Sequence, residues 1–273
     1  MVISRTPFRI SFFGGGTDYP DWFKKEGGAV LSTAIDKYCY ISCRKLPPFF
    51  DAKHRIVWSK IETVSDVDLI THPAIRAALQ EYFPEGCPGI EIHHQGDLPA
   101  RSGIGSSSSF AVGLLKAIYA HKGKLIGRHE LASLAIHLEQ QLLGENVGCQ
   151  DQIAAAFGGF NLIEFKKSGE FTVDPLPIAP ERLKSLNDSL FLYYTGTTRI
   201  ASEIAGDLIA NFEQKQQHIR RMRAMVDEGV QILASTQSLD AFGTLLDEAW
   251  HHKKSLSKLI SNSTIDEIYA QGK

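Results

Sequence analysis

Two glycines followed by four serines form the most distinctive polar stretch of the chain. Residues 110–120 behind them carry apolar side chains at helical spacing, and residues 89–93 ahead of them alternate like a strand. A glycine turn that leads from a strand into a helix directs backbone N–H groups and the helix dipole at one point, which suits a phosphate chain. The serine hydroxyls add donors and an oxygen ligand for a metal ion. The residues concerned are Gly103, Gly105, Ser106, Ser107, Ser108 and Ser109.

Two simpler interpretations of this stretch are disfavoured. A flexible Ser/Gly linker does not usually lie between a strand and an amphipathic helix. Two common nucleotide motifs are also missing, because no Gly-Lys-Ser/Thr follows the glycines and no acidic residue on a later strand completes a dinucleotide fingerprint.

The order Pro-x-x-x-Gly-x-Gly-Ser-Ser-Ser that starts at Pro99 resembles the second motif of the GHMP kinases, which include galactokinase, homoserine kinase and mevalonate kinase. In that family the motif forms the phosphate loop for ATP. The resemblance implies ATP-binding roles for Pro99, Arg101, Gly103, Gly105, Ser106, Ser107, Ser108 and Ser109. Trp58, on a predicted strand, is a further candidate that could stack on adenine, although an ordinary core or edge aromatic residue is an equal alternative.

The segment Pro7-Phe8-Arg9 through Phe13-Gly14-x-x-Thr17-Asp18 resembles the first motif of the same family. The resemblance implies that Arg9 lies beside the transferred phosphate and that Asp18 binds sugar hydroxyls. Without it, a solvated strand charge and a turn residue would be the better interpretations. Gly15 and Gly16 stand where galactokinases carry an acidic residue and a histidine. That loss opens space at the substrate, so the resemblance favours a longer or phosphorylated sugar and the heptose 7-phosphate kinase branch.

Two carboxylates complete the expected site. Asp151, followed by Gln and a run of small residues, matches the catalytic aspartate segment of the sugar kinases in the family. Glu139, on the preceding predicted helix, corresponds to the acidic ligand of Mg²⁺, with Ser107 as the hydroxyl ligand. The alternatives are a helix N-cap for Asp151 and a surface charge for Glu139. A carboxylate among apolar Ala, Ile and Phe residues seldom contributes to packing, so the functional roles of Asp151 and Glu139 are favoured over these alternatives.

A cluster of hydroxyls beside an arginine opens the second half of the chain. Thr197, Thr198 and Arg199 are expected to face the sugar as a clamp for hydroxyls or phosphate, although Thr198 could simply cap a helix. Arg101 and Arg199 are the candidate cations for a phosphate on the sugar itself. The implied reaction is transfer of the γ-phosphoryl group of ATP to a sugar hydroxyl; the alternatives are an L-fucose kinase, a galactokinase-like or mevalonate-type enzyme, or a sensor that binds without transfer.

The elements that must position these residues are a mixture of strands and helices. Strands are predicted at residues 2–13, 29–46, 55–64, 160–166 and 190–195, and helices at 68–83, 110–120, 128–143, from 200 onward, at 239–260 and from 265. The resemblance implies an α+β fold of two domains: a ribosomal-S5-like ATP-binding domain over 1–185 and a ferredoxin-like domain over 186–273. The third Gly-rich motif of the family is not found, so we expect the second domain to be incomplete.

Composition limits the partners. The 273 residues are 43% hydrophobic and 22% charged with a net charge of −2, which gives no indication of a nucleic-acid partner. No apolar run long enough to span a membrane and no signal peptide are found. Four cysteines without metal-ligand spacing favour a cytoplasmic protein with reduced thiols. The expected partner is a small sugar or sugar phosphate, and the oligomeric state is left open.

Overall fold

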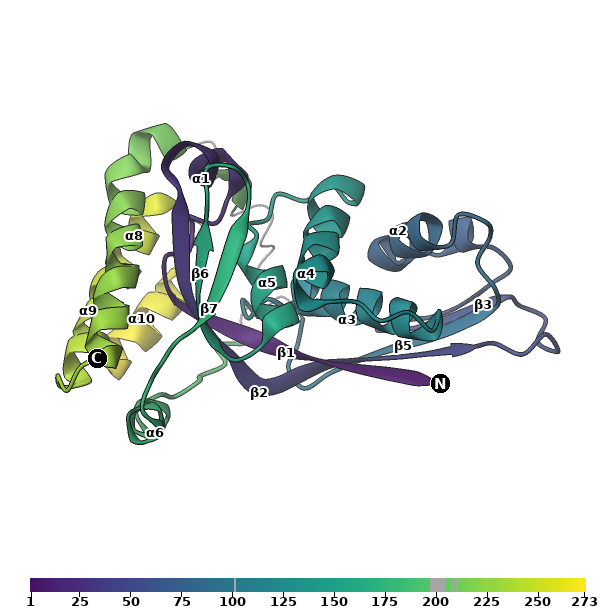
Figure 1. The fold of residues 1–273 in the computed structure, drawn as a ribbon, viewed down its shortest axis with the longest axis horizontal. Helices are drawn as coiled ribbons and strands as arrows, with labels where there is room; N and C mark the ends of the chain where they lie inside the picture. Colours follow the sequence, from purple (N-terminus) through teal and green to yellow (C-terminus); the bar gives the residue numbers. More distant parts are fainter. Residues whose placement is uncertain (101, 197–204, 208, 210) are drawn as a thin grey trace. The chain divides into compact units, whose positions relative to one another are not determined.

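The computed structural model describes residues 1–100, 102–196, 205–207, 209 and 211–273 (Figure 1). They form two compact units, each assembled from separate stretches of chain. The first unit comprises Met1–Arg9, Ala34–Val147 and Asp151–Gly158, and the second comprises Ile10–Thr33, Gly148–Gln150 and Gly159–Lys273. Two long strands, β1 (Val2–Phe13) and β2 (Gly28–Lys45), pair with each other and contribute residues to both units.

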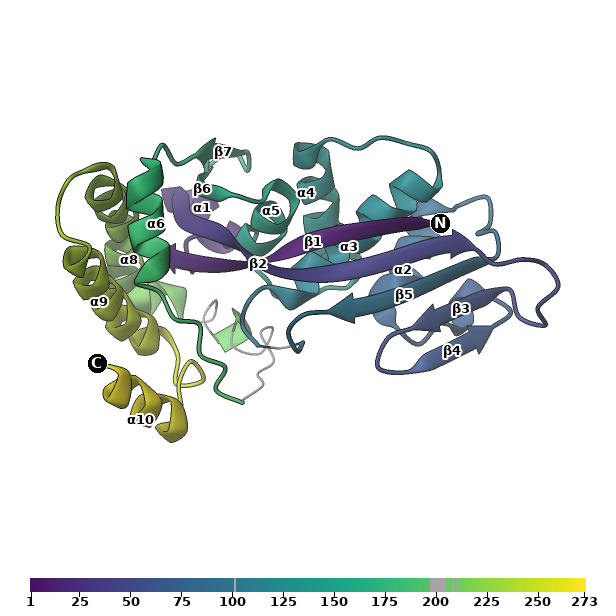
Figure 2. The same cartoon turned by 90° about the horizontal axis from the view of Figure 1, so that it is seen from below.

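The first unit is a sheet covered by helices on one face (Figures 1 and 2). Its strands follow the order β4-β3-β5-β2, and β3 runs parallel to β5 while the other pairs are antiparallel. The strands alternate buried and exposed side chains, and Ile41, Ile56 and Ile92 face the core. The other elements are β3 (His54–Val57), β4 (Ile61–Val64), β5 (Ile90–Gly96), η1 (Val67–Leu69), α2 (Pro73–Tyr82), α3 (Ser106–His121), α4 (Arg128–His137), η2 (Leu138–Leu142) and α5 (Gln150–Phe157).

The helix α3 is the centre of this unit. Leu114, Leu115 and Ile118 are fully buried, and the helix is apolar nearly all round. A helix that is apolar on every side must be enclosed by other elements, and here α2, α4 and the strands supply that cover. The enclosure fixes the position of the first turn of α3.

The second unit pairs the first part of β2 with β6 (Phe160–Phe165), which in turn pairs with β7 (Phe171–Pro175), both antiparallel. The helices α8 (Phe212–Ala234) and α9 (Asp240–Leu256) lie side by side (Figure 1). Phe13 and Phe242 meet edge to face at 5.1 Å and anchor α9 to β1. The remaining helices are α1 (Pro20–Glu26), α6 (Pro180–Asp188) and α10 (Ser263–Gly272).

Most predicted elements are found, with three differences. The predicted strand at 55–64 is a hairpin, because residues 58–60 turn between β3 and β4. The predicted helix at 128–143 changes from α to π geometry at Leu138. The predicted strand at 190–195 is wrong: a strand needs a hydrogen-bonded neighbour, none of the described strands pairs with it, and Phe191 is 95% exposed. The start of the predicted helix at residue 200 lies outside the described residues.

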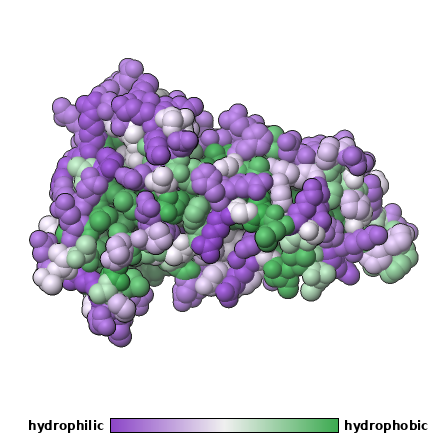
Figure 3. Space-filling model, viewed as in Figure 1, coloured by the Kyte–Doolittle hydropathy of each residue, from purple (hydrophilic) through white to green (hydrophobic). Residues whose placement is uncertain are grey.

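Among the described residues, no helix is long and apolar enough to cross a membrane. Hydrophilic side chains cover much of the face in Figure 3, with smaller hydrophobic areas between them. All four cysteines lie among the described residues, are buried and form no disulfide.

Candidate active site

The glycine–serine stretch begins α3, as predicted. Gly105 is the N-cap residue, and its φ of 73° lies in the left-handed region that glycine adopts without a steric penalty. The helix starts at Ser106, and the Ser109 N–H donates to the Gly105 carbonyl at 2.9 Å. The first N–H groups of a helix have no carbonyl partner within that helix. The first turn of α3 therefore offers the donors and the positive dipole end that an anion needs.

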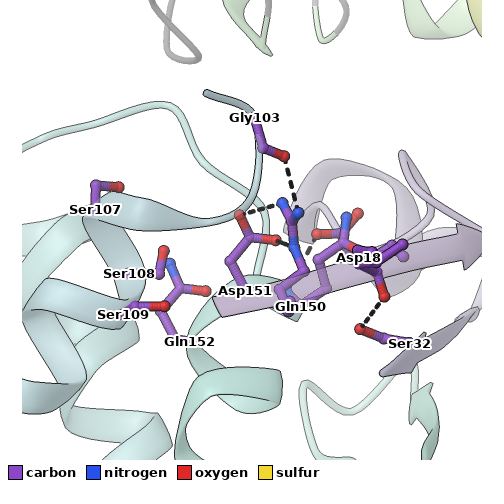
Figure 4. A network of polar contacts seen from close by, with 12 residues as sticks. Asp18, Ser32, Gly103, Ser107, Ser108, Ser109, Gln150, Asp151 and Gln152 are labelled. Atoms are coloured by element: carbon purple, nitrogen blue, oxygen red, sulfur yellow. Dashed lines mark hydrogen bonds and ion pairs between the residues drawn. The ribbon is translucent and has the colours of Figure 1, made fainter. Parts of the chain in front are cut away.

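An arginine–aspartate pair lies beside the glycine loop that leads into this turn, and Figure 4 shows Asp151 and Gly103 on either side of the pair's hydrogen bonds. Arg9 of β1 donates from Nε to Asp151 Oδ1 at 2.7 Å and from one terminal nitrogen to Asp151 Oδ2 at 2.6 Å. Its other terminal nitrogen donates to the Gly103 carbonyl at 2.9 Å. A bidentate pair holds both planar groups in one orientation. The guanidinium therefore ties the glycine loop to the carboxylate, with the two side chains 14% and 25% exposed.

Gly105 is required by this contact as well as by its backbone angle. A Cβ atom at this position would lie 3.3 Å from both Arg9 Cγ and Asp151 Oδ2. A side chain would press on the ion pair from the loop side. Gly103 differs, since its φ is 81° but no described atom lies within 4 Å of a Cβ placed there.

Glu139 forms a second polar centre beside the first turn of α3. It is 2% exposed, and its two carboxylate oxygens accept hydrogen bonds from three side chains. Ser107 Oγ donates to Oε1 at 2.7 Å, while Ser108 Oγ and Gln152 Nε2 donate to Oε2 at 2.7 and 2.6 Å. The carboxylate thus links α3, η2 and α5.

Burial raises the pKa of the Glu139 carboxyl from its ordinary value of 4.5 to about 7, and the hydrogen bonds from Ser108, Ser107 and Gln152 only partly oppose this effect. A cation near the carboxylate would favour the charged form. A carboxylate and two serine hydroxyls in one place are hard oxygen donors of the kind that Mg²⁺ accepts alongside phosphate oxygens. The donor set therefore fits a metal ion shared with a nucleotide. No cluster of three or more His, Cys, Asp or Glu side chains suited to a metal is found among the described residues.

A π-helical turn places Glu139 in this position. The Leu143 N–H donates to the Leu138 carbonyl five residues back, at 3.0 Å, so η2 is wider than the α-helix before it. Such turns insert one extra residue and change which side chains face the neighbouring helix, and they occur often at functional sites. No local sequence signal predicted this turn.

In the second unit, Asp18 closes a glycine turn. Gly14 and Gly16 have φ angles of 87° and 106°. The Asp18 carboxylate is 1% exposed and accepts hydrogen bonds from the backbone N–H groups of Gly16 and Gln150, at 3.0 and 3.2 Å. Gly148 packs so closely that a Cβ atom there would lie 1.9 Å from Asp18 Oδ2. Asp18 therefore holds residues 148–150 against the turn, and its predicted contact with the sugar stays a prediction.

The other predicted residues have varied positions. Trp58 packs at the edge of the first core, donates from its indole N–H to Glu62 at 2.7 Å and meets the His72 ring edge to face. Ser109 is buried and donates to the Pro7 carbonyl at 2.9 Å, which ties α3 to β1. Pro99 is exposed. Four predicted residues lie outside the described residues: Arg101, Thr197, Thr198 and Arg199.

Two glutamines were not predicted as site residues. Gln152 bonds to Glu139, and Gln150 bonds through its backbone to Asp18 and through its side-chain oxygen to the Ser11 hydroxyl. Both flank Asp151 in the sequence. Amides on either side of a candidate catalytic aspartate were the available signal, because a buried amide usually has a hydrogen-bonded partner.

Comparison with known proteins finds several similar kinases. A family model described as the GHMP kinases N terminal domain matches residues 68–159. A D-glycero-alpha-D-manno-heptose 7-phosphate kinase of Campylobacter jejuni is 30% identical over 278 residues, which cover 98% of this chain and 81% of that protein. A bifunctional fucokinase/GDP-fucose pyrophosphorylase of Arabidopsis thaliana is 25% identical over 96% of this chain but only 27% of its own length.

Among solved structures, a D-glycero-D-manno-heptose 1-phosphate kinase of Bacteroides thetaiotaomicron has a similar fold. Its TM-score is 0.68 at 26% identity, with 93% of this chain and 79% of that chain covered. The identity to the Campylobacter enzyme extends over nearly the whole chain and includes both units. The chain therefore belongs to the GHMP kinases, ATP-dependent enzymes that transfer a phosphoryl group to an alcohol.

Proposed function

We propose that this kinase phosphorylates a sugar phosphate, and that its substrate is D-glycero-D-manno-heptose 7-phosphate, which it converts to the 1,7-bisphosphate. The main support is the bidentate Arg9–Asp151 pair, which lies against the glycine loop at the start of α3. That arrangement combines anion donors, a cation and a carboxylate at one place. Phosphoryl transfer depends on positioning and on stabilising charge, and these are the groups it requires.

Each of these residues has a role in the proposed mechanism. The first turn of α3, from Ser106 onward, binds phosphate oxygens through its N–H groups. Arg9 compensates the charge that develops on the transferred group. Asp151 accepts a hydrogen bond from the sugar hydroxyl, either as the base that takes its proton or as an anion that orients it. Arg9 also fixes both Asp151 oxygens, so the carboxylate has one orientation before the substrate binds.

Glu139 and Ser107 would hold Mg²⁺. A bound metal ion supplies positive charge to the phosphate oxygens and lowers the barrier to transfer. The chain's own contribution is the rigid carboxylate, which Ser108 and Gln152 hold on the side away from Ser107. The raised pKa of Glu139 agrees with a site built to share its charge with a cation.

The sugar contacts are proposed from the family motifs. Asp18, Gly15 and Gly16 would surround the sugar, and the clamp of Thr197, Thr198 and Arg199 would meet its hydroxyls or phosphate. Pro99, Arg101, Gly103 and Trp58 would bind ATP. The division into an ATP-binding domain over 1–185 and a second domain over 186–273 is part of the same proposal, as is a cytoplasmic location.

Asp151→Asn tests the mechanism. The variant keeps the shape of the side chain but removes its charge, so ATP binding measured by calorimetry should remain while ADP release falls by about a hundredfold or more. Asp188→Asn is a matched control, because Asp188 is exposed at the end of α6 and pairs with Lys184 one turn earlier in the same helix. Full turnover in Asp151→Asn would remove this residue from the chemistry.

The match to the fucokinase makes L-fucose a second candidate acceptor. A panel of heptose 7-phosphate, free heptose, L-fucose and galactose in the ADP-release assay separates the acceptors. Binding of sugar phosphate without any ADP release would instead identify a sensor that does not transfer phosphate.

A further inference from the structure

The two oxygens of the Glu139 carboxylate have different surroundings. Oε2 accepts hydrogen bonds from Ser108 Oγ at 2.7 Å and from Gln152 Nε2 at 2.6 Å, and both of these side chains are buried. Oε1 accepts a hydrogen bond from Ser107 Oγ at 2.7 Å, and Ser107 is exposed. Figure 4 shows Ser107 apart from Ser108 and Gln152. All four residues belong to the first unit, so this asymmetry lies within one compact body.

The number of hydrogen bonds on each oxygen decides which one can take a further ligand. A carboxylate offers about four acceptor sites, two on each oxygen. Ser108 and Gln152 occupy both sites of Oε2. Oε1 has one donor among the described residues, Ser107, and this donor is the exposed one. Oε1 is therefore the oxygen with a remaining acceptor site, and it lies on the accessible side.

The Gln152 side chain is oriented by Glu139 at the expense of its own carbonyl group. Gln152 is fully buried, and its Oε1 atom has no hydrogen-bond partner among the described residues. A buried carbonyl oxygen without a donor is unfavourable. Because an ionised carboxylate only accepts hydrogen bonds, the amide must nevertheless direct its N–H group at Glu139. The contact with Glu139 therefore determines the orientation of this amide.

We propose that Gln152 and Ser108 are positioning residues that keep Oε2 away from the metal ion, so that Glu139 binds the ion through Oε1 alone and the site favours Mg²⁺ over Ca²⁺. This inference rests on the proposed function, which assigns the metal ion to Glu139 and Ser107. Mg²⁺ requires nearly octahedral coordination, whereas Ca²⁺ accepts six to eight oxygens and often binds both oxygens of a carboxylate. A carboxylate that cannot turn withholds its second oxygen from Ca²⁺.

Gln152→Met tests this role, because it removes one hydrogen bond from Oε2 and lets the carboxylate turn. The affinity for a non-hydrolysable ATP analogue is measured by calorimetry with saturating Mg²⁺ and with saturating Ca²⁺. The ratio of the two affinities should shift towards Ca²⁺ by about fivefold or more. A purely structural role would weaken binding with both ions equally and leave the ratio unchanged. Gln141→Met, at an exposed position of η2, is the matched control and should keep the wild-type ratio.

Ser108→Ala gives an independent test, because it removes the other hydrogen bond from Oε2. It should shift the ratio in the same direction, and its control is Ser133→Ala, since the exposed Ser133 hydroxyl donates to the His129 carbonyl within α4. Thermal melts show which variants are folded. Gln152→Met should remain folded, because methionine fills a similar volume and removes the unpartnered carbonyl. A wild-type ratio in either folded variant would overturn the proposal.

The same measurements separate this inference from the proposed function. If the wild type binds the analogue with Mg²⁺ but transfers no phosphate to heptose 7-phosphate, the proposed reaction fails, and a shifted ratio in Gln152→Met still supports the inference. If the wild type is active and the ratio does not shift, only the inference fails. If neither ion changes binding of the analogue to the wild type, the inference and the proposed metal ligands are both overturned.

Discussion

The buried carboxyl of Glu139 makes a quantitative prediction about stability and pH. Its folded-state pKa of about 7 lies above the ordinary value of 4.5 that the unfolded chain should have. The folded state therefore binds the proton more tightly than the unfolded state. The contribution of the protonated Glu139 carboxyl to the free energy of unfolding is fully present below about pH 4.5 and is lost as the pH rises through about 7.

The size of this effect follows from the two pKa values. At 1.36 kcal/mol for each pKa unit, the carboxyl should cost the ligand-free protein about 3 kcal/mol when it is fully ionised, and most of this loss falls between pH 5 and pH 8. The side chain is 2% exposed, so screening by water reduces the estimate little.

Glu139→Gln should remove this dependence. The amide cannot ionise, and its NH₂ group can donate to Gln152 Oε1, a buried oxygen that has no partner among the described residues. Once Gln152 turns its amide, the serine hydroxyls can still bond to the new side chain. Between pH 5 and pH 8 the free energy of unfolding should therefore fall by about 3 kcal/mol less in the variant than in the wild type.

Urea denaturation at several pH values measures this difference. Glu130→Gln is the control, because Glu130 is exposed in the first turn of α4, and it should follow the wild type. The reasoning would be refuted if the wild type and Glu139→Gln had the same pH profile. Added MgATP should also flatten the wild-type profile, because a bound cation favours the ionised carboxylate.

The remaining predictions concern glycines. Gly105→Ala should lower the free energy of unfolding by about 1–2 kcal/mol and reduce turnover, because it combines a left-handed φ with a Cβ atom 3.3 Å from Asp151 Oδ2. Gly103→Ala should show only the backbone cost in stability, because no described atom lies within 4 Å of its Cβ atom. Equal turnover of the two variants in the ADP-release assay would contradict this. Gly229→Ala should cost about 1–3 kcal/mol, because its Cβ atom would lie 2.7 Å from the Phe13 ring. Gly243→Ala, with no described atom within 4 Å, should instead stabilise α9 by up to about 1 kcal/mol. A thermal melt of both variants checks these signs, and a stabilised Gly229→Ala would disprove the close packing of α8 on β1.

Local patterns predicted much of the fold. The alternation of apolar residues was sufficient to predict β1, and their helical spacing after Ser109 was sufficient to predict α3. In each segment the spacing of the apolar residues matches the spacing at which that kind of element buries its side chains. The strand predicted at 190–195 failed for the opposite reason. Its apolar residues look like a strand, but a strand is stable only when another strand completes its hydrogen bonds.

The sequence by itself determined the chemical groups of this protein and their order: a glycine turn with an aspartate, a glycine–serine loop that starts a helix, and two carboxylates downstream. These are local properties of residue type and spacing. The tertiary structure alone decided the pairings, such as Arg9 with Asp151 across 142 positions of the chain. The reason is physical: distances between remote side chains, burial and shifts in pKa depend on how the elements pack, and the π turn at Glu139 shows that one extra residue in a helix changes which side chains meet.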